Sequence, residues 1–433
     1  MNAITDPRRL PDEVPLRGID RFFLLLEGMM RRQGRPGQVC HLSLTLEGPL
    51  TADTLEDRLR RHPLSQWLGR LRLRTGWHPF QTPKWTTSGE STIPVHSHPC
   101  GEIDPPPPEY LRIQLDVQQE IPVRFDLIPS ADGTRTLLLF HWHHALMDST
   151  GALLYLRSLA GQFEKASPPI LWQPPPADSR PWRKRMQDLQ HCKARIYERS
   201  EGDFFHPTGS PGRTLSYHQL HFTPEETEQV DKQAVAAGAS LQRSAYYLAA
   251  TAAALRSVCE PSGSDLDFLT SLPQDQRRKG VMGPILANQV SFLFYRLPGN
   301  LLADRKNTVK EISRQMMEDL RVNFSKSYTR MMDLTLRFPS PLFRQLIRSP
   351  TKGKMASCWF SDTGTTLDSL QTFLELPVTG AEHFPPNMCP PGLTVISSRF
   401  NGRLMVTVAV FDGILPDDSL SRFLDGLRRE LTA

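Results

Sequence analysis

The sequence HWHHALMDSTG, from His141 to Gly151, is the most informative stretch of this 433-residue chain. The residues before it, 136–142, are mostly apolar and predict a strand. The residues after it, ALLYLRSLAGQF at 152–163, carry leucines spaced three apart and predict a helix. The stretch is therefore expected at the end of a strand, where a rigid scaffold can direct a reactive side chain into a cleft.

Two residues of this connection suit proton-transfer chemistry. His144 is the only one of the 13 histidines that is followed four residues later by an aspartate, Asp148. The unperturbed pKa of histidine lies near neutrality, so an imidazole can take up a proton and return it within one turnover. A carboxylate four positions on could orient the loop or hold the imidazole through a charged hydrogen bond. The alternative is a histidine that only satisfies the hydrogen bonds of a strand-end turn.

Outside this connection, the hydrophobic pattern predicts a mixed α/β chain. Further strands are predicted at 37–48, 111–115, 123–127, 392–397 and 404–411, and helices at 51–62, 181–198, 224–237 and 241–258. The dipeptide Asn401-Gly402 predicts a hairpin between the last two strands. Thr223 and Glu226 have the spacing of a helix capping box.

The chain is expected to form two lobes, because it is too long for one ordinary compact core. The segment 167–180 is rich in proline and predicts a stiff spacer. We assign residues 1–175 to an N-terminal lobe with the His144 loop, residues 176–213 to a proline-rich and basic linker, and residues 214–433 to a C-terminal lobe.

Composition and charge exclude several classes of protein. Hydrophobic residues make up 39% and charged residues 22% of the chain, which excludes disordered and fibrous proteins. A net charge of +5 is too small to indicate nucleic-acid binding. The six cysteines form no CxxC pair, the N-terminus lacks an apolar export segment, and no apolar run could span a bilayer. We therefore expect a cytoplasmic monomer.

Basic residues are concentrated in two runs, at 179–199 and 321–354. Such runs suit an anionic partner, such as a phosphorylated cofactor, an acidic carrier domain or a membrane surface, or they form a solvated helix face. The segment 337–348 also contains apolar residues. It could make a peripheral membrane contact, touch an acidic carrier helix or pack into the core.

Motifs for other chemistries are weak or missing. Two histidine groups, His96 with His98 and His141 with His143, could offer metal ligands, but neither has further ligands at a recognised spacing. No metal is therefore expected. The chain has no phosphate-binding Walker loop, no GxGxxG after a strand and no GxSxG elbow.

The stretch around His144 resembles the HHxxxDG motif of the condensation-type acyltransferase superfamily. Its members include nonribosomal peptide condensation domains, polyketide-associated acyltransferases, bacterial wax-ester synthases and chloramphenicol acetyltransferases. Further segments resemble motifs of the same superfamily in the same order: Arg17 to Phe23, Leu272 to Arg277, Ala287 to Ser291, Phe360 to Gly364 and Arg399 to Leu404. The resemblance therefore covers nearly the whole chain.

The resemblance implies a fold of two chloramphenicol-acetyltransferase-like lobes in a V-shaped pseudo-dimer, with the active site in a tunnel between them. His144 would be the general base. His143 would support the loop, and Asp148 would pair with Arg277 to fix it. Asn288, Ser291, Ser361 and Asp362 would lie near the substrate tunnel.

The resemblance also implies the reaction. An acyl group would pass directly, without an acyl-enzyme, from a phosphopantetheine thioester (acyl-CoA or an acyl carrier protein) to a small-molecule alcohol or amine. No cofactor would be bound permanently. The product would be an ester or amide of secondary-metabolite or lipid biosynthesis.

The sequence departs from the motifs at three positions. Ser149 stands where the superfamily has glycine, Ala287 replaces the glycine of the GNxxS segment, and Asp362 replaces the asparagine of SNxxG. A glycine with positive φ would make such an exchange costly. Two alternatives therefore stay open: a hydrolytic or cyclising member of the superfamily, and a degenerate partner-binding module without catalysis.

Overall fold

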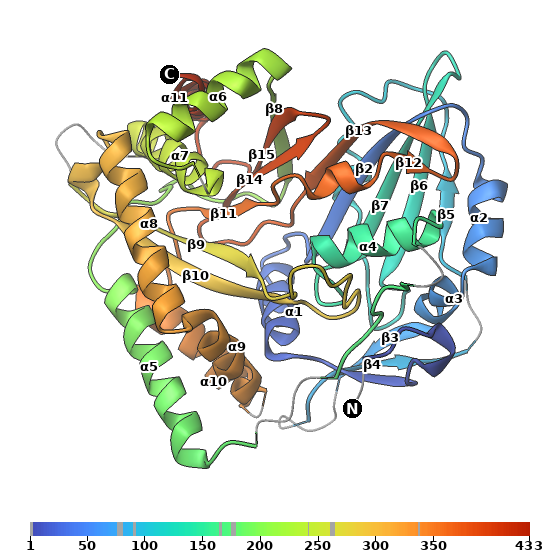
Figure 1. Cartoon of the computed structure of the whole chain (residues 1–433), viewed down its shortest axis with the longest axis horizontal. Coiled ribbons are helices and arrows are strands. Elements are labelled where there is room, and N and C mark those ends of the chain that lie inside the picture. The colour runs from blue at the N-terminus through green and yellow to red at the C-terminus, as the bar shows by residue number, and fades with distance from the viewer. Residues whose placement is uncertain are drawn as a thin grey trace.

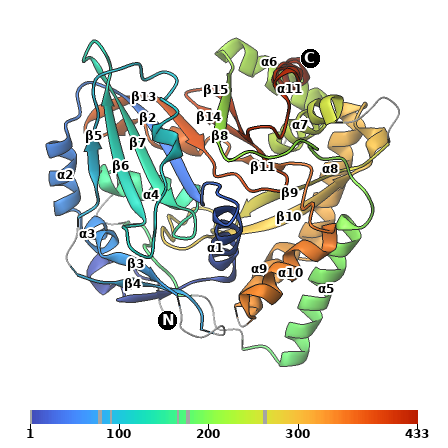
Figure 2. The ribbon, with the colours of Figure 1, turned by 180° about the vertical axis from the view of Figure 1, so that it is seen from behind.

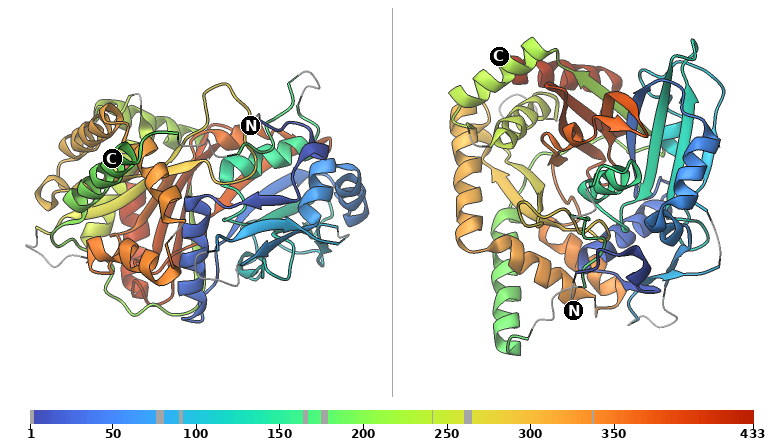
Figure 3. Two further views of the ribbon diagram at one scale, coloured as in Figure 1. Left: turned by 90° about the horizontal axis from the view of Figure 1, so that it is seen from below. Right: turned by 45° about the vertical axis from the view of Figure 1, so that its right-hand side comes forward.

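The computed structural model describes residues 3–75, 81–89, 92–163, 167–174, 179–240, 242–259, 265–336 and 338–433. The protein is mixed α/β, as predicted. Its two halves meet along helix α1, Gly18–Arg31, which lies between them in opposite views (Figures 1 and 2). Two further directions show the same arrangement (Figure 3).

The first half is built on a six-stranded sheet with the order β12-β13-β2-β7-β6-β5. Helix α4 lies along one face of this sheet (Figure 1). Its apolar residues are buried, which explains the leucine spacing seen in the sequence. The elements of this half are β2 Val39–Glu47, α2 Ala52–Arg61, α3 Pro63–Gly69, β5 Val95–Ser97, β6 Val123–Pro129, β7 Arg135–His143 and α4 Ser149–Leu159, with a small sheet of β1 Glu13–Pro15, β4 Lys84–Thr87 and β3 Leu71–Arg74.

Strand β13 links the two ends of the sequence. It runs over Leu376–Phe384 and pairs antiparallel with β2, and the short β12, Thr372–Phe373, pairs with it in turn. Residues near the C-terminus thus complete the sheet that carries the His144 loop. The predicted boundary between residues 213 and 214 therefore does not separate the two sheets. Strand β13 lies after this boundary in the sequence but belongs to the sheet of the first half.

The second half contains a four-stranded sheet, β11-β14-β15-β8, and a two-stranded hairpin of β9 and β10. Helices cover the outer side of both (Figure 1). The elements are α5 Trp182–Ser200, β8 Leu215–His221, α6 Pro224–Ala236, α7 Arg243–Cys259, β9 Phe268–Asp275, β10 Val290–Leu297, α8 Arg305–Arg321, α9 Phe324–Thr335, α10 Ser340–Arg348, β11 Trp359–Asp362, β14 Leu393–Phe400, β15 Arg403–Phe411 and α11 Asp417–Thr432.

Local signals in the sequence account for most of these elements. The capping box is present, since Thr223 and Glu226 each accept a hydrogen bond from the other's backbone N–H. The hairpin between β14 and β15 turns at Asn401 and Gly402, which both have positive φ. The predicted first residue of the next helix, residue 241, lies outside the described residues, and α7 runs over Arg243–Cys259.

One predicted strand, at 111–115, is wrong. This segment begins with a 3-10 turn at Tyr110–Arg112. Tyr110 and Leu111 donate their backbone N–H groups to the carbonyls of Pro107 and Pro108. The prolines fix the turn geometry locally, and the apolar residues that follow fill the core without pairing in a sheet.

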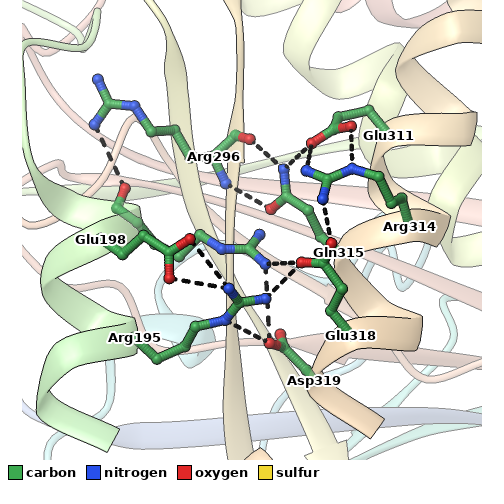
Figure 4. A network of polar contacts seen from close by, with 9 residues as sticks. Arg195, Glu198, Arg296, Glu311, Arg314, Gln315, Glu318 and Asp319 are labelled. Carbon is green, nitrogen blue, oxygen red and sulfur yellow. Dashed lines mark hydrogen bonds and ion pairs between the residues drawn. The ribbon is translucent and has the colours of Figure 1, made fainter. Parts of the chain in front are cut away.

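Helix α5 occupies much of the predicted linker, of which residues 176–178 lie outside the described part. Its arginines pair with acidic side chains of α8 (Figure 4). Arg195 lies 2.7 Å from Glu318 and 3.1 Å from Asp319. The basic run at 179–199 is therefore partly neutralised inside the protein, which weakens it as a surface for an anionic partner.

Candidate active site

The His144 loop connects β7 directly to α4. His143 is the last residue of β7, and Asp148 is the N-cap of α4. One carboxylate oxygen of Asp148 accepts the backbone N–H of Gly151 at 2.8 Å, which satisfies one of the free donors at the helix start. Five residues, 144–148, thus connect a buried strand to a buried helix, so both ends of the loop are fixed.

His144 presents an imidazole that is neutral at physiological pH. Its ring stacks on Phe23 of α1, with 3.7 Å between ring centroids and 16° between planes. Its backbone N–H donates to the carbonyl of Gln38 at 2.8 Å. Burial lowers the pKa of His144 to about 4, although Asp148 acts in the opposite direction. The buried Nδ1 has no hydrogen-bond partner in the described structure.

His143 supports the loop through hydrogen bonds of its ring. Its Nδ1 accepts the backbone N–H of Ala145 at 3.1 Å, so Nε2 carries the hydrogen and donates to Glu27 at 2.8 Å. Burial works to raise the pKa of Glu27, but His143 and Arg31 outweigh it and lower that pKa. The ring of His143 is fully buried, and these contacts fit the supporting position that the resemblance implies.

Asp148 and Arg277 form a bidentate ion pair across the loop, with N–O distances of 3.0 and 2.9 Å. Their side chains are only 4% and 6% exposed. The carboxylate also accepts the backbone N–H of Gln289 at 2.7 Å, and Arg277 donates to the carbonyl of Pro284. The pair expected from the resemblance is therefore present, and it ties the segment 275–289 onto the His144 loop.

Asn288 connects this segment to α1 and to the catalytic candidate. Its side-chain amide donates to the carbonyl of His144 and to the carboxylate of Asp20, both at 2.7 Å. Burial raises the pKa of Asp20 to about 6, even though the backbone N–H groups of Arg17 and Asn288 also donate to it. Three segments far apart in the sequence therefore meet at the loop.

A cavity of about 140 Å³ lies beside His144. Both halves of the chain line it, through Phe23, Gln38, His41, His144, Ser271, Pro273, Val290, Phe292, Trp359, Ser361 and His383, among others. Ser361 is thus at the cavity. Ser291 is not, because strand alternation turns it to the opposite face from Val290 and Phe292, where its hydroxyl donates to the carbonyl of Ser325.

Asp362 also lies outside the cavity lining. Its carboxylate accepts the backbone N–H of Gly364 at 3.1 Å and the hydroxyl of Ser397 at 2.9 Å. Burial raises its pKa. The side chain of Asp362 therefore stabilises the turn after β11. Asn288 also lies outside the cavity lining, and its amide binds the backbone carbonyl of His144.

Three cavity residues that the sequence did not indicate carry buried polar atoms without a partner in the described structure. Gln38 is fully buried, and neither heteroatom of its amide has a partner in the described structure. The same holds for Nε2 of His383 and Nε1 of Trp359. Unpaired buried polar groups are costly, so these atoms are positioned for bound water or substrate. No local motif surrounds them, because strand pairing and loop packing alone bring them together.

The substitution of glycine by Ser149 leaves the loop geometry intact. Ser149 is the first residue of α4, and it is not among the residues with positive φ. The glycine that packing requires is Gly151. A Cβ atom built there would lie 2.3 Å from the carbonyl oxygen of Ile285. The second departure from the motifs, Ala287, is different, because this residue has a φ of 67°.

We expect Ala287→Gly to stabilise the protein by about 1 kcal/mol, because the left-handed conformation costs a residue with Cβ roughly that much. The hydrogen bond from the N–H of residue 287 to the carbonyl of Leu146 would remain. Urea unfolding of both proteins measures the difference. Ala239→Gly, at another buried alanine that is not among the positive-φ residues, is the control and is expected to destabilise. Equal losses at both positions would contradict this account of Ala287.

Three of the four histidines considered as metal ligands, His98, His141 and His143, have carboxylate partners. His98 and His141 lie 2.5 and 3.0 Å from Asp126, and His41 contacts His141 at 2.6 Å. Within the described residues, no group of three or more histidine, cysteine, aspartate or glutamate side chains could hold a metal ion. In the same residues, no helix has the length and apolar character needed to cross a bilayer.

Comparison with solved structures places this architecture among condensation domains. A trichothecene 15-O-acetyltransferase from Fusarium sporotrichioides superimposes with a TM-score of 0.70 at 13% identity, over 97% of this chain and 95% of the other. The first condensation domain of the CDA synthetase gives 0.68 at 16% identity, over 97% and 96%. The epimerization domain from the third module of tyrocidine synthetase B gives 0.63 at 13% identity, over 100% and 97%.

These matches show that the protein has the condensation-domain fold, as predicted. No protein-family model and no curated protein matches the sequence. The three structures are named for acetyl transfer, condensation and epimerization, so the fold alone does not select one reaction. The reaction that this protein catalyses must therefore be inferred from the residues of the cavity.

Proposed function

We propose that the protein is an acyltransferase that moves an acyl group from a phosphopantetheine thioester to a hydroxyl or amine. The observation that carries the proposal is the neutral imidazole of His144 at a cavity, on a loop fixed by a buried ion pair. A low pKa keeps this base unprotonated at pH 7, and stacking on Phe23 fixes the orientation of the ring. General-base catalysis needs an unprotonated base and a fixed geometry toward the proton that the base takes up.

In the proposed reaction His144 takes the proton of the acceptor O–H or N–H as the acceptor attacks the thioester carbonyl. A new C–O or C–N bond forms, and the carbonyl electrons move onto oxygen. When the tetrahedral intermediate collapses, the C–S bond breaks and the thiolate leaves. The proton on His144 passes to this thiolate, so the base returns to its starting state.

The anionic part of the donor suits a second cavity, of about 590 Å³, at the junction of α1 and α10. Four cationic residues line it, Arg32, Arg344, Arg348 and Lys352, and its described lining contains no acidic side chain. Both acyl-CoA and a carrier protein present phosphate next to the pantetheine arm, and arginine binds phosphate through charge-assisted hydrogen bonds. This supports either donor. The basic run at 321–354 supplies three of the four residues.

The pH dependence of the reaction tests the identity of the base. Because the pKa of His144 is lowered to about 4, we expect kcat/KM for thiol release from acyl-CoA to be constant between about pH 5.5 and 8. Below about pH 4 it should fall tenfold per pH unit as the base is protonated. Circular dichroism over the same range controls for unfolding. An acid limb near the ordinary histidine value of about 6.5 would argue against this base.

A further inference from the structure

A chamber of about 430 Å³ adjoins the smaller cavity at His144. Helices α5, α9 and α10 and the hairpin β9-β10 surround it, and they lie together in Figure 1. Most of its lining is phenylalanine, tyrosine, methionine, leucine and isoleucine. Lys193 is the one charged residue among its described lining, and the other polar side chains there are mainly the hydroxyls of serine and threonine. Its volume is in the range of about 300–1,000 Å³ found for small-molecule sites.

One face of the β9-β10 hairpin runs from the cavity into the chamber. Pro273 and Val290 line only the cavity, Ser271 and Phe292 line both spaces, and Phe294 lines only the chamber. Because side chains on one face of a strand are two residues apart, this order follows from the antiparallel pairing of Phe292 with Pro273 and of Phe294 with Ser271. The hairpin thus forms one continuous, mostly apolar side wall that the two spaces share.

Trp359 of β11 stands at the same junction and lines both spaces. Its buried indole N–H has no partner in the described structure. A ligand that passes from the chamber to His144 would offer this donor an acceptor, such as a carbonyl oxygen. The junction therefore combines an apolar path with one unused hydrogen-bond donor.

The chamber has a fixed outer wall and an apolar opening. The ion pairs of Arg195 with Glu318 and Asp319 anchor α5 to α8 (Figure 4). On α10, Phe343 is buried, whereas Leu342 and Leu346 line the chamber and are 44% and 40% exposed. The apolar residues of segment 337–348 therefore divide between the core and the lining of the chamber. Arg337 lies outside the described residues.

We propose that this chamber holds an aliphatic chain of a substrate, with the polar end of that chain at Trp359 and pointing toward His144. The inference rests on the proposed function and deepens it, because it names the substrate class. Either the acyl group of the donor or an apolar acceptor could supply the chain. In both cases the chamber would bind an aliphatic chain, and the turnover experiment below distinguishes the donor from the acceptor as its source.

Binding of a dibrominated octadecanoate tests the chamber without any turnover, because bromine quenches nearby tryptophan fluorescence. We expect saturable quenching in the wild type, and most of it should disappear in Trp359→Phe. Ser200→Phe and Ile196→Phe, which place a larger side chain into the chamber, should weaken binding at least tenfold. Gln190→Phe, at an exposed position on the same helix, is the matched control and should bind as the wild type does.

No saturable quenching, or equal affinity in the folded chamber variants and the control, would overturn the proposal. Binding that persists in His144→Ala would keep the chamber assignment even if the proposed reaction failed. Among saturated fatty acids, affinity should rise by about fourfold per added methylene until the chamber is full.

Turnover then identifies the source of the chain. With one acceptor and a series of acyl-CoA donors, a shift of Ser200→Phe toward shorter acyl chains assigns the chamber to the donor. With one donor and a series of alkanols, a shift toward shorter alkanols assigns it to the acceptor. An unchanged preference in both series would overturn the proposal.

Discussion

Replacement of Asp148 by alanine will lower the free energy of unfolding by about 3–5 kcal/mol, the cost of leaving one partner of a buried ion pair uncompensated. Arg277 would keep its charge at a site where its side chain is 6% exposed. The N–H groups of Gly151 and Gln289 would also lose their acceptor. Urea unfolding followed by circular dichroism measures the loss, and a low yield of folded protein is expected at 37 °C.

An exposed ion pair provides the matched control for this change. Asp57 contacts Arg60 at 2.7 Å on the surface of α2, with both side chains about half exposed. Asp57→Ala should cost less than about 1 kcal/mol. Arg277→Met should destabilise like Asp148→Ala, and the double variant should lose less than the sum of the two. A stable, soluble but inactive Asp148→Ala protein would contradict the structural assignment of this carboxylate.

Replacement of His144 by alanine will lower kcat for acyl transfer by about 10²- to 10⁴-fold, the contribution of a positioned general base. The fold should persist, because Nδ1 of the imidazole has no hydrogen-bond partner in the described structure and the ring stacks on Phe23. Thermal unfolding should therefore change little. Added imidazole, which can enter the vacated space, is expected to restore part of the rate.

His191→Ala is the control for general effects of losing a histidine, because His191 is exposed on α5 and distant in the chain from the loop. It should retain wild-type activity. Undiminished thioester turnover in His144→Ala would show that this residue is not the base.

The sequence predicted the loop well because its determinants are local. The strand before His144, the helix after it and the capping carboxylate of Asp148 all lie within the single segment 135–159. The partner Arg277 could be named only through the resemblance, since nothing near residue 277 reveals which acid it meets. The same applies to Asn288, whose contact with Asp20 joins positions far apart in the chain.

Features that depend on tertiary packing could not be predicted. Nothing in the local sequence of 376–384 says that this strand completes the first sheet beside β2. The orientation of Ser291 depends on the register of β10, because a shift of one residue would exchange the two faces. The chamber arises from helices brought together in space, and its residues read in sequence as ordinary core positions.

The most direct test of the account follows acceptor and thiol together. Wild-type protein is incubated with acyl-CoA and a panel of alcohols and amines, and mass spectrometry counts acylated acceptor while a thiol reagent counts free CoA. We expect one acylated acceptor per thiol released, no acylated protein, and loss of both products in His144→Ala. Thiol release without acylated acceptor would indicate a hydrolase, and failure of the folded wild type to turn over with any acceptor would contradict catalysis by His144.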